Sequence, residues 1–398
     1  MAIIGGGTAG LFLAAFLNPD IFNVTIFEKK SSLGRKFLVA GVGGFNLTHS
    51  EALPILKSRY TPTSFLDDAL DKFSNEDLRN WFLNLGIPTF VGSSGRIFPE
   101  KEIKPIDVLK SIEKHLLEKN IKFEFNKTFT DWDNENAIEF DSKEIIKSDY
   151  TVFALGGSSW KVTGSDGSWL DLFSKKGIDT LAFSPSNCAY KIKWDETFIQ
   201  KNEGNPLKNI SISIENKTQK GEAVITKFGI EGNAIYGLSP EIQGVLATKK
   251  EAVVHIDFKP IYDLPALVEK ITQAKSNTTA TLRDSLKLPR TVIDLIKVTL
   301  TKDEFLDHQI LAKFIKSFPL TIVNSAPIDE AISTSGGIDL KAVDSSFQLE
   351  KLKNNFCIGE MLDWNAPTGG YLIQACASMG VYLAGHLNNK SKAGNIQR

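Results

Sequence analysis

The order of apolar and polar residues over the first 28 positions predicts a strand, a turn, a helix and a second strand. Residues 2–4 (AII) form a short apolar run, and residues 11–17 (LFLAAFL) form a longer one after three consecutive glycines. Residues 24–27 (VTIF) form a third run that ends at Glu28. Short apolar strands on either side of an apolar helix are typical of a βαβ unit in a parallel sheet.

The hydrophobic pattern changes twice further along the chain. Residues 104–119 have the spacing of an amphipathic helix, and strand-like runs then lead to Gly156-Gly157. Short alternating runs begin near residue 184, and residues 262–317 become helical. We therefore expect an α/β fold with three domains. These are an FAD-type domain at 1–183 plus 335–398, an inserted antiparallel β domain at 184–260 plus 318–334, and a helical subdomain at 261–317.

Composition and charge narrow the function classes. The 46 basic and 47 acidic residues give a net charge of −1, which is not typical of a partner for nucleic acid or an anionic membrane. Three cysteines and five histidines are scattered without a disulfide or metal spacing. No run reaches the roughly 18 apolar residues of a membrane span. We expect a soluble, cytoplasmic protein with a small-molecule site, and no metal, membrane or nucleic-acid partner.

A glycine motif joins the first strand to the first helix. In Gly5-x-Gly7-x-x-Gly10, the first glycine permits a tight turn, the second lets the backbone approach a diphosphate, and the third lets the helix pack on the strand. The helix N-terminus offers free N–H groups to the phosphates. Glu28 can accept hydrogen bonds from ribose hydroxyls and would repel a 2′-phosphate. The motif predicts FAD or NAD rather than NADP.

Three later glycine segments favour FAD, the longer cofactor. Ala154 and Gly156-Gly157 follow an apolar strand, and residues 359–363 (GEMLD) end another. Gly369-Gly370 then open the last helix, whose N-terminus can stabilise negative charge on a reduced flavin.

Longer motifs resemble those of the YhiN/BaiN-type flavoproteins, also described as HI-type or aminoacetone-oxidase-like FAD-binding proteins. The resemblance covers essentially the whole chain, and GRKFLVAGVGGFNLTHS at 34–50 and GEMLDWNAPTGGYLIQACASMG at 359–380 are its most specific parts. It implies a glutathione-reductase-like FAD-binding Rossmann domain with an inserted β-rich domain and a small helical domain. It also implies an FAD-dependent oxidoreductase.

The glycine motif and the resemblance together assign the cofactor-binding residues. Segment 34–48 would line FAD, and Phe129, in the strand before the Gly156-Gly157 turn, would give a backbone contact near the adenine. The last motif would hold the middle of FAD and the isoalloxazine. The predicted residues are Gly5, Gly7, Thr8, Ala9, Gly10, Glu28, Lys29, Arg35, Lys36, Gly43, Gly44, Asn46, Leu47, Thr48, Phe129, Ala154, Gly156, Gly157, Gly359, Glu360, Asp363, Gly369, Gly370 and Tyr371.

The chain departs from the wider family at one triplet. Much of the family carries Arg/Lys-Cys-Asn where this chain has Gly44-Phe45-Asn46. Because no cysteine adjoins the flavin motif, a dithiol–disulfide relay is not expected. We interpret Cys357 and Cys376 as small buried hydrophobic residues.

Catalytic groups are harder to identify than cofactor residues. His49 is a candidate proton donor, with a solvated or capping loop residue as the alternative. Arg96 is a candidate anion binder, with a structural salt bridge as the alternative. Further candidates near the flavin cavity are Lys161, Thr163 and Asp166, together with three tryptophans that either stack on flavin or pack in the core, Trp160, Trp169 and Trp364.

The expected reaction is hydride transfer through flavin N5, from NAD(P)H or from a small reduced substrate. The sequence has no second GxGxxG unit, so a nicotinamide donor would dock transiently. Two alternatives stay open, namely an FAD-dependent RNA-modifying enzyme and a non-catalytic flavin-binding redox protein.

Overall fold

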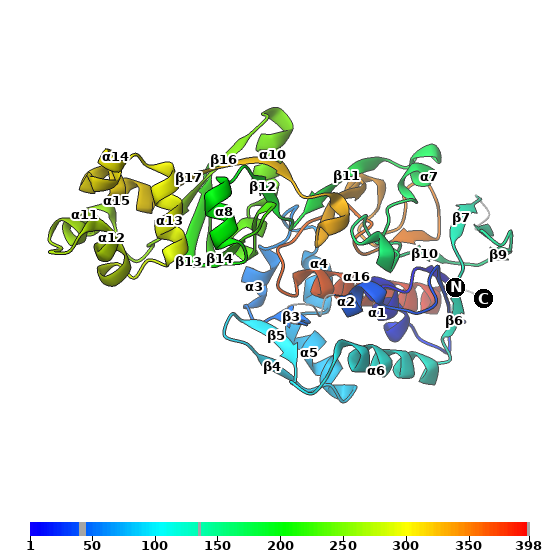
Figure 1. Ribbon diagram of the computed structural model, residues 1–398. Helices are drawn as coiled ribbons and strands as arrows, with labels where there is room; N and C mark the ends of the chain where they lie inside the picture. Colours follow the sequence, from blue (N-terminus) through cyan, green and yellow to red (C-terminus); the bar gives the residue numbers. More distant parts are fainter. Residues whose placement is uncertain (40–44, 134–136, 396–398) are drawn as a thin grey trace. The chain divides into compact units, whose positions relative to one another are not determined.

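The computed structural model describes residues 1–39, 45–133 and 137–395, with only the backbone described for 391–395. The chain divides into two compact units (Figure 1). Unit 1 contains Met1–Ser184 and Ile332–Arg398, and unit 2 contains Pro185–Ala331. The finer division of the inserted part into a β domain and a helical subdomain stays a prediction.

A five-stranded parallel sheet forms the centre of unit 1. Its order is β19-β10-β1-β2-β6, and each neighbouring pair is parallel. Strand order reverses between β1 and β10, and ligands of such sheets bind at that point, beyond the carboxyl ends of the strands. This arrangement confirms the predicted Rossmann fold. The strands are β1 (Ala2–Ile4), β2 (Thr25–Glu28), β6 (Lys122–Phe125), β10 (Thr151–Phe153) and β19 (Asn355–Cys357).

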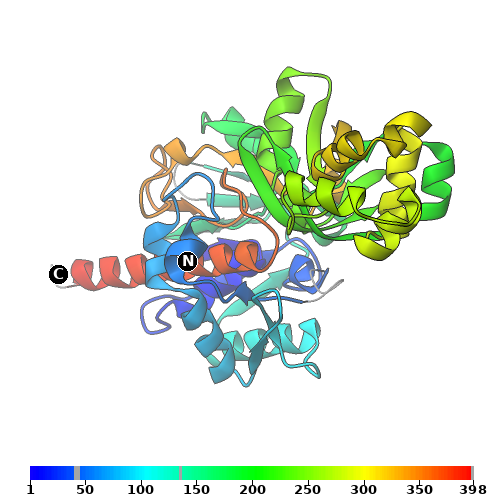
Figure 2. The same cartoon turned by 90° about the vertical axis from the view of Figure 1, so that its left-hand side faces the viewer.

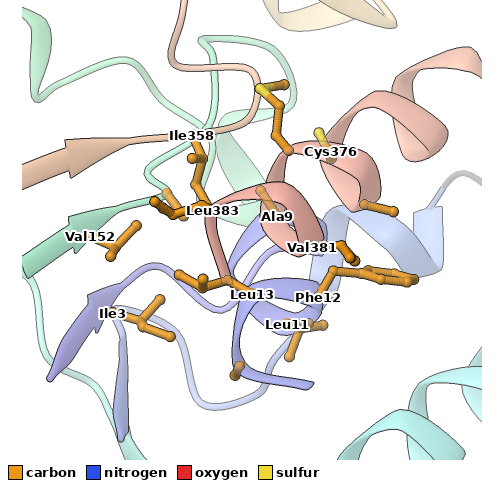
Figure 3. Packing of buried hydrophobic residues seen from close by; sticks show 14 of the residues in the cluster. Ile3, Ala9, Leu11, Phe12, Leu13, Val152, Ile358, Cys376, Val381 and Leu383 are labelled. Carbon is orange, nitrogen blue, oxygen red and sulfur yellow. The ribbon is translucent and has the colours of Figure 1, made fainter. Parts of the chain in front are cut away.

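Two helices cover the centre of this sheet. Helix α1 (Thr8–Phe16) follows β1, and the long helix α16 (Tyr371–Asn395) lies beside it in both views (Figures 1 and 2). Figure 3 shows Ile3, Val152 and Ile358 gathered around Leu13 of α1 and Leu383 of α16. Because α1 is buried on nearly every side, its sequence is apolar almost throughout.

The other elements of unit 1 surround this sheet. Two small antiparallel sheets have the orders β3-β5-β4 and β7-β8-β9, and β11 pairs with β18. The predicted amphipathic helix is α6, which buries its apolar stripe. The bounds are α2 (Arg35–Val39), β3 (Thr48–His49), α3 (Leu53–Lys57), α4 (Asp67–Lys72), α5 (Asn75–Asn84), β4 (Thr89–Val91), β5 (Arg96–Pro99), α6 (Pro105–Glu118), β7 (Phe129–Trp132), β8 (Ala137–Phe140), β9 (Ile145–Lys147), η1 (Lys161–Thr163), α7 (Leu170–Lys175), β11 (Thr180–Ser186), β18 (Ser333–Ile338) and η4 (Leu340–Ala342).

The expected place of Phe129 was wrong. It lies in β7, whereas β10 is the strand that leads into the Gly156-Gly157 turn. Strands β7, β8 and β9 form an antiparallel excursion between β6 and β10, and β7 pairs only with β8 among the described strands. The Phe129 ring packs on Phe153 of β10, with 5.2 Å between ring centroids.

Unit 2 contains a closed antiparallel barrel in the order β12-β15-β14-β13-β16-β17. Buried and exposed residues alternate along β16, as expected for a strand with one face toward an apolar interior. Figure 1 shows helices α11 to α15 gathered at one end of the barrel. The bounds are β12 (Tyr190–Ile192), α8 (Glu196–Asn202), β13 (Pro206–Ile214), β14 (Lys217–Ile225), β15 (Gly229–Glu231), α9 (Asn233–Tyr236), α10 (Ser239–Thr248), β16 (Ala252–Asp257), α11 (Leu264–Thr272), α12 (Thr278–Ala280), the π-helical η2 (Thr281–Ser285), α13 (Arg290–Thr299), α14 (Lys302–Leu306), α15 (His308–Lys316), β17 (Phe318–Ser325) and η3 (Ile328–Glu330).

The contact between α1 and α16 gives a test of the core. A Cβ on Gly380 would lie 2.7 Å from Leu13 N and 2.8 Å from Ala9 O, so Gly380→Ala must push the helices apart. We expect a loss of about 1–3 kcal/mol and a lower melting temperature. At Gly385 a Cβ would meet only the flexible Lys72 side chain, at 3.5 Å. Gly385→Ala on the same helix should therefore be neutral, or stabilising by up to about 1 kcal/mol. Equal melting temperatures for the two variants would contradict this packing.

Candidate functional site

The turn after β1 presents free backbone groups at the switch point of the sheet. Gly5 has φ +110°, and a Cβ there would lie 2.3 Å from Ala154 O, so the turn requires glycine. Gly7 is the N-cap of α1, and a Cβ there would meet nothing within 4 Å. No side chain in the described part caps α1, and its first turn has no acidic residue. The helix start, with Thr8 and Ala9, is open to an anionic ligand.

Glu28 is held beside this turn by two backbone groups. Its Oε2 accepts the Gly6 N–H at 2.8 Å and its Oε1 accepts the Lys30 N–H at 2.9 Å. A carboxylate oxygen can accept a second hydrogen bond, so both oxygens keep capacity for hydroxyl groups. The acid and the glycine turn therefore form one preorganised surface at the carboxyl edge of the sheet.

Predicted residues from two other segments meet nearby. Lys36 Nζ lies 2.9 Å from Glu360 Oε2 and donates to Ser159 Oγ at 2.9 Å. A Cβ on Gly359 would lie 2.9 Å from Ala9 Cβ, which places the end of β19 against α1. The GRK segment and the GE segment thus converge on the start of α1. Gly43 and Gly44 lie outside the described residues.

Lys29 and Asp166 form an ion pair at 2.8 Å. Burial raises the pKa of the Asp166 carboxyl, but hydrogen bonds from Lys29 and Ser168 outweigh burial, so its pKa lies below the ordinary value. The Lys29 ammonium is therefore committed to Asp166. Lys161 and Thr163 lie in the short helix η1, where the Thr163 hydroxyl donates to Trp160 O at 2.7 Å.

Two of the three tryptophans support the glycine turns from the core. The Trp169 indole N–H donates to Gly156 O at 3.0 Å, and the Trp364 indole N–H donates to Gly359 O at 2.8 Å. Both rings are buried, as expected for core packing. Asp363 has a similar supporting position, because its Oδ1 accepts the Gly336 N–H at 2.7 Å.

The second and last motifs meet at the start of α16. A Cβ on Gly370 would lie 2.5 Å from Thr48 Cα, so the Gly369-Gly370 turn touches the backbone of β3. Gly369 has φ +124°, and a Cβ there would lie 3.3 Å from the Tyr371 ring and 3.4 Å from Arg96 Nε. Strand β3 pairs with β5, so His49 lies opposite Arg96.

A buried amide also points to a ligand in this region. Asn46 Nδ2 is buried and has no hydrogen-bond partner in the described part of the chain, whereas the neighbouring Leu47 N–H donates to Ile97 O at 2.8 Å. A buried donor without a partner is costly unless a ligand satisfies it.

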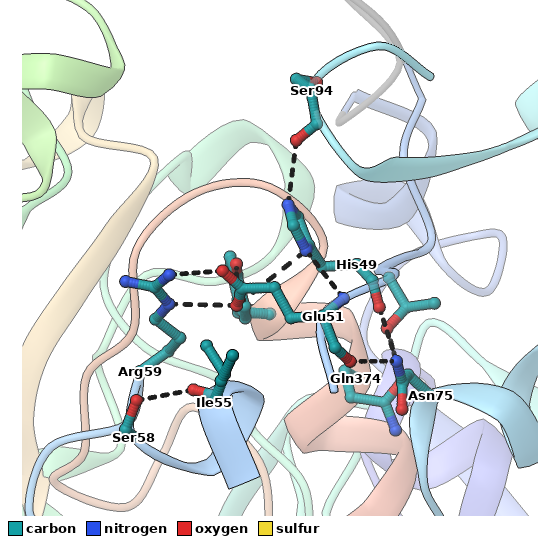
Figure 4. A network of polar contacts seen from close by, with 10 residues as sticks. His49, Glu51, Ile55, Ser58, Arg59, Asn75, Ser94 and Gln374 are labelled. Carbon is teal, nitrogen blue, oxygen red and sulfur yellow. Dashed lines mark hydrogen bonds and ion pairs between the residues drawn. The ribbon is translucent and has the colours of Figure 1, made fainter. Parts of the chain in front are cut away.

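A charged network includes the Tyr371 hydroxyl. Arg59 donates two hydrogen bonds to the Glu51 carboxylate, one of them from Nε to Oε2 at 3.0 Å (Figure 4). The Tyr371 hydroxyl donates to the same Oε2 at 2.8 Å. Burial raises the pKa of Glu51, but the hydrogen bonds from Arg59 and Tyr371 outweigh it, and its pKa lies below the ordinary value. Burial, followed by the hydrogen bond to Glu51, raises the pKa of Tyr371.

His49 uses both ring nitrogens on backbone groups. Its Nδ1 accepts the Glu51 N–H at 3.2 Å, and its Nε2 lies 3.1 Å from Ser94 O, to which it must donate (Figure 4). The ring stacks on Tyr371 with 5.2 Å between centroids. This geometry defines one neutral tautomer and favours the capping alternative over proton donation.

No sequence motif pointed to Glu51, Arg59 or Asn75 as site residues. The Asn75 amide donates to His49 O and Glu51 O, which holds β3 and the network together. Glu51 follows the second motif directly, and that position was the only available signal.

In the described part of the chain, no group of three His, Cys, Asp or Glu side chains could hold a metal ion. No helix there has the length and apolarity of a membrane span.

The arrangement fits an extended dinucleotide cofactor. Uncapped amides and an oriented carboxylate lie at one end, and an unsatisfied amide and a double-glycine helix start lie at the other. One unit provides all these groups.

The chain is similar to known proteins along nearly its whole length. Residues 1–387 match the family described as HI0933-like protein Rossmann domain. A ribosomal RNA dihydrouridine synthase from Haemophilus influenzae is 24% identical over 401 residues, 94% of each chain. A 3-dehydro-bile acid delta(4,6)-reductase from Clostridium scindens is 25% identical over 410 residues, 97% of this chain and 98% of that protein. A 3-ketosteroid-delta4-(5alpha)-dehydrogenase structure from Rhodococcus jostii RHA1 has a TM-score of 0.49 at 12% identity, covering 96% of each chain.

A substitution that replaces a single oxygen atom of the side chain tests the role of Glu28. In Glu28→Gln an amide NH₂ replaces one oxygen, so it faces either the Gly6 or the Lys30 N–H and loses that hydrogen bond. We expect FAD to bind about 10-fold or more weakly, the equivalent of one charged hydrogen bond. Titration of the apoprotein with FAD measures the effect. Glu144→Gln, which alters an exposed ion pair with Lys127, should bind FAD as the wild type does.

Proposed function

The chain belongs to the HI0933-like family, and on this premise we propose that it is an FAD-dependent reductase of a carbon–carbon double bond conjugated to a carbonyl group. Its cofactor is FAD and its class is FAD-dependent oxidoreductase. The direction of the reaction and the type of substrate are the proposed part.

The observation that carries the proposal is the shared chemistry of two relatives that match nearly end to end. One is named for making dihydrouridine, which is uridine with two hydrogens added across its ring double bond. The other is named for a delta(4,6)-reduction of a 3-dehydro-bile acid. In each case, a carbon–carbon double bond of a ring with a carbonyl group gains two hydrogens.

Residues of unit 1 would hold the cofactor along its length. The start of α1 binds the diphosphate, Glu28 binds a ribose, and Lys36 with Glu360 lies beside the middle of the molecule. Asn46 and the Gly369-Gly370 turn bind the flavin end. When bound, FAD supplies hydride exchange at its N5 atom. A nicotinamide nucleotide is the proposed electron donor, and it docks transiently.

Tyr371 is the proposed donor of the proton that the substrate carbon gains. Its hydroxyl is protonated at neutral pH, as in any tyrosine, and burial and the Glu51 carboxylate raise its pKa further above the ordinary value. The α-carbon of a saturated carbonyl compound is a weaker acid than a tyrosine hydroxyl, so a tyrosine can protonate the corresponding carbanion. Glu51 is partly exposed and can return a proton from water to Tyr371.

A small-molecule substrate is favoured over RNA by the net charge of −1. Uridine in ribosomal RNA is the second candidate, since dihydrouridine synthases from Haemophilus influenzae and Escherichia coli both match 94% of this chain.

The proposal predicts turnover with simple conjugated substrates. The purified holoprotein should oxidise NADH or NADPH in the presence of cyclohex-2-enone or a steroid enone, and mass spectrometry should show a gain of two hydrogens. A transcript of ribosomal RNA, analysed for dihydrouridine after nuclease digestion, tests the second candidate. Failure to reduce any conjugated enone or uridine, with flavin that a nicotinamide donor does reduce, would reject the reaction.

The proton role predicts a selective defect in Tyr371→Phe. Transfer to the enone should slow by about 10²–10⁴-fold, whereas reduction of the flavin by the nicotinamide donor should be unchanged. Stopped-flow measurement of the two half-reactions separates these steps. Tyr382→Phe removes a hydroxyl from the same helix, where the ring packs on Phe347, and should leave both half-reactions unchanged. Equal slowing of both half-reactions in Tyr371→Phe would indicate a structural role.

A further inference from the structure

The arginines of the described chain fall into two groups. Four of the six pair with a carboxylate, namely Arg59, Arg79, Arg283 and Arg290. The Arg35 and Arg96 side chains have no ion pair or hydrogen bond within the described residues, although both are half-buried. Arg35 begins α2 directly after Gly34, whose N–H donates to Gly6 O of the glycine turn, so Arg35 lies beside the proposed phosphate site. Arg96 lies at the other end of the site.

The position of Arg96 is fixed by the strand that carries it. Strand β5 pairs with β3, and the Arg96 side chain extends to the Gly369 turn. Arg96 Nε and the Tyr371 ring lie 3.4 Å and 3.3 Å from the same point, the position of a Cβ on Gly369. A guanidinium without a counter-charge and the side chain of the proposed proton donor thus border one small space that glycine leaves open.

The neighbouring charged groups are already engaged. Glu51 accepts hydrogen bonds from Arg59 and Tyr371, and His49 is bonded at both nitrogens to backbone groups. The structural salt bridge considered for Arg96 is not present among the described residues. A half-buried guanidinium is unfavourable without an oxygen ligand, and planar oxygen groups are the ligands it binds best.

We propose that Arg96 binds the carbonyl oxygen of the conjugated substrate and stabilises the enolate that forms during reduction. This proposal rests on the proposed function. As a hydride bonds to the β-carbon, the double-bond electron pair moves to the bond between the α-carbon and the carbonyl carbon, and the carbonyl oxygen takes the negative charge of the enolate. The electron pair then takes a proton at the α-carbon, and the carbonyl is restored. Overall, a nicotinamide nucleotide provides the hydride and water provides the proton.

A stable oxyanion tests the binding step without turnover. The probe is the phenolate of 4-hydroxybenzaldehyde, a planar oxygen anion, titrated into holoprotein by calorimetry at a pH where it is ionised. Arg96→Gln should weaken binding by about 10-fold or more. Arg96→Lys should weaken binding less, because lysine keeps the positive charge but lacks the planar pair of N–H donors. Arg79→Gln, on α5, is the matched control and should bind the probe as the wild type does. FAD content and melting temperature identify any variant that fails to fold.

Each outcome decides the proposal. Weakened probe binding in Arg96→Gln, with a matching fall in enone turnover, supports it. Unchanged probe binding in Arg96→Gln, or no binding by the wild type, overturns it. Lower FAD affinity with unchanged probe binding also overturns it and assigns Arg96 to the cofactor. If the wild type binds the probe through Arg96 but reduces no enone, the oxyanion site stands and the proposed reaction fails.

Discussion

The backbone contact between α1 and α16 determines where both ends of the site lie. Helix α1 begins at the glycine turn after β1, and α16 begins at the Gly369-Gly370 turn. Gly380 has no side chain, so α16 lies directly against the backbone of α1 at Ala9 and Leu13. Two helix starts are thereby fixed relative to one sheet edge, where the proposed cofactor site lies. Reacting groups must be placed to within less than about an ångström, and their placement depends on this fixed spacing between α1 and α16.

The side chains of the site fall into two groups, those that stabilise its turns and those whose donors are available to a ligand. The side chains of His49, Asp363 and two tryptophans form hydrogen bonds within the protein, with backbone oxygens and amides. Such fully satisfied groups lock the turns that carry them. Asn46, Arg35 and Arg96 have side-chain donors without a partner in the part of the chain that the structure describes. A partly buried hydrogen-bond donor that has no partner among the described residues is therefore the best local indication of a ligand contact.

Local sequence patterns predicted the parts of the fold that depend on near neighbours. The βαβ unit, the place of Glu28 and the amphipathic helix 105–118 follow from short-range periodicity and turn chemistry, and the structure has them. The place of Phe129 was wrong because strands β7 to β9 pair antiparallel, outside the main sheet. The contact of Tyr371 with Glu51 spans 320 positions, and no periodicity within one chain can reveal it.

The small scale of the reacting cluster explains how one arrangement could serve very different substrates. A guanidinium that binds a carbonyl oxygen and a tyrosine that holds a proton recognise only a conjugated oxygen and its α-carbon. Relatives named for a bile acid and for ribosomal RNA are about equally similar to this chain, at 25% and 24% identity. Substrate choice must then come from residues that do not touch the reacting atoms, because discrimination depends on contacts made by the rest of the substrate. Under the proposed reaction, substitutions at those residues should alter KM among enones, whereas Arg96 and Tyr371 would act on the step common to all of them.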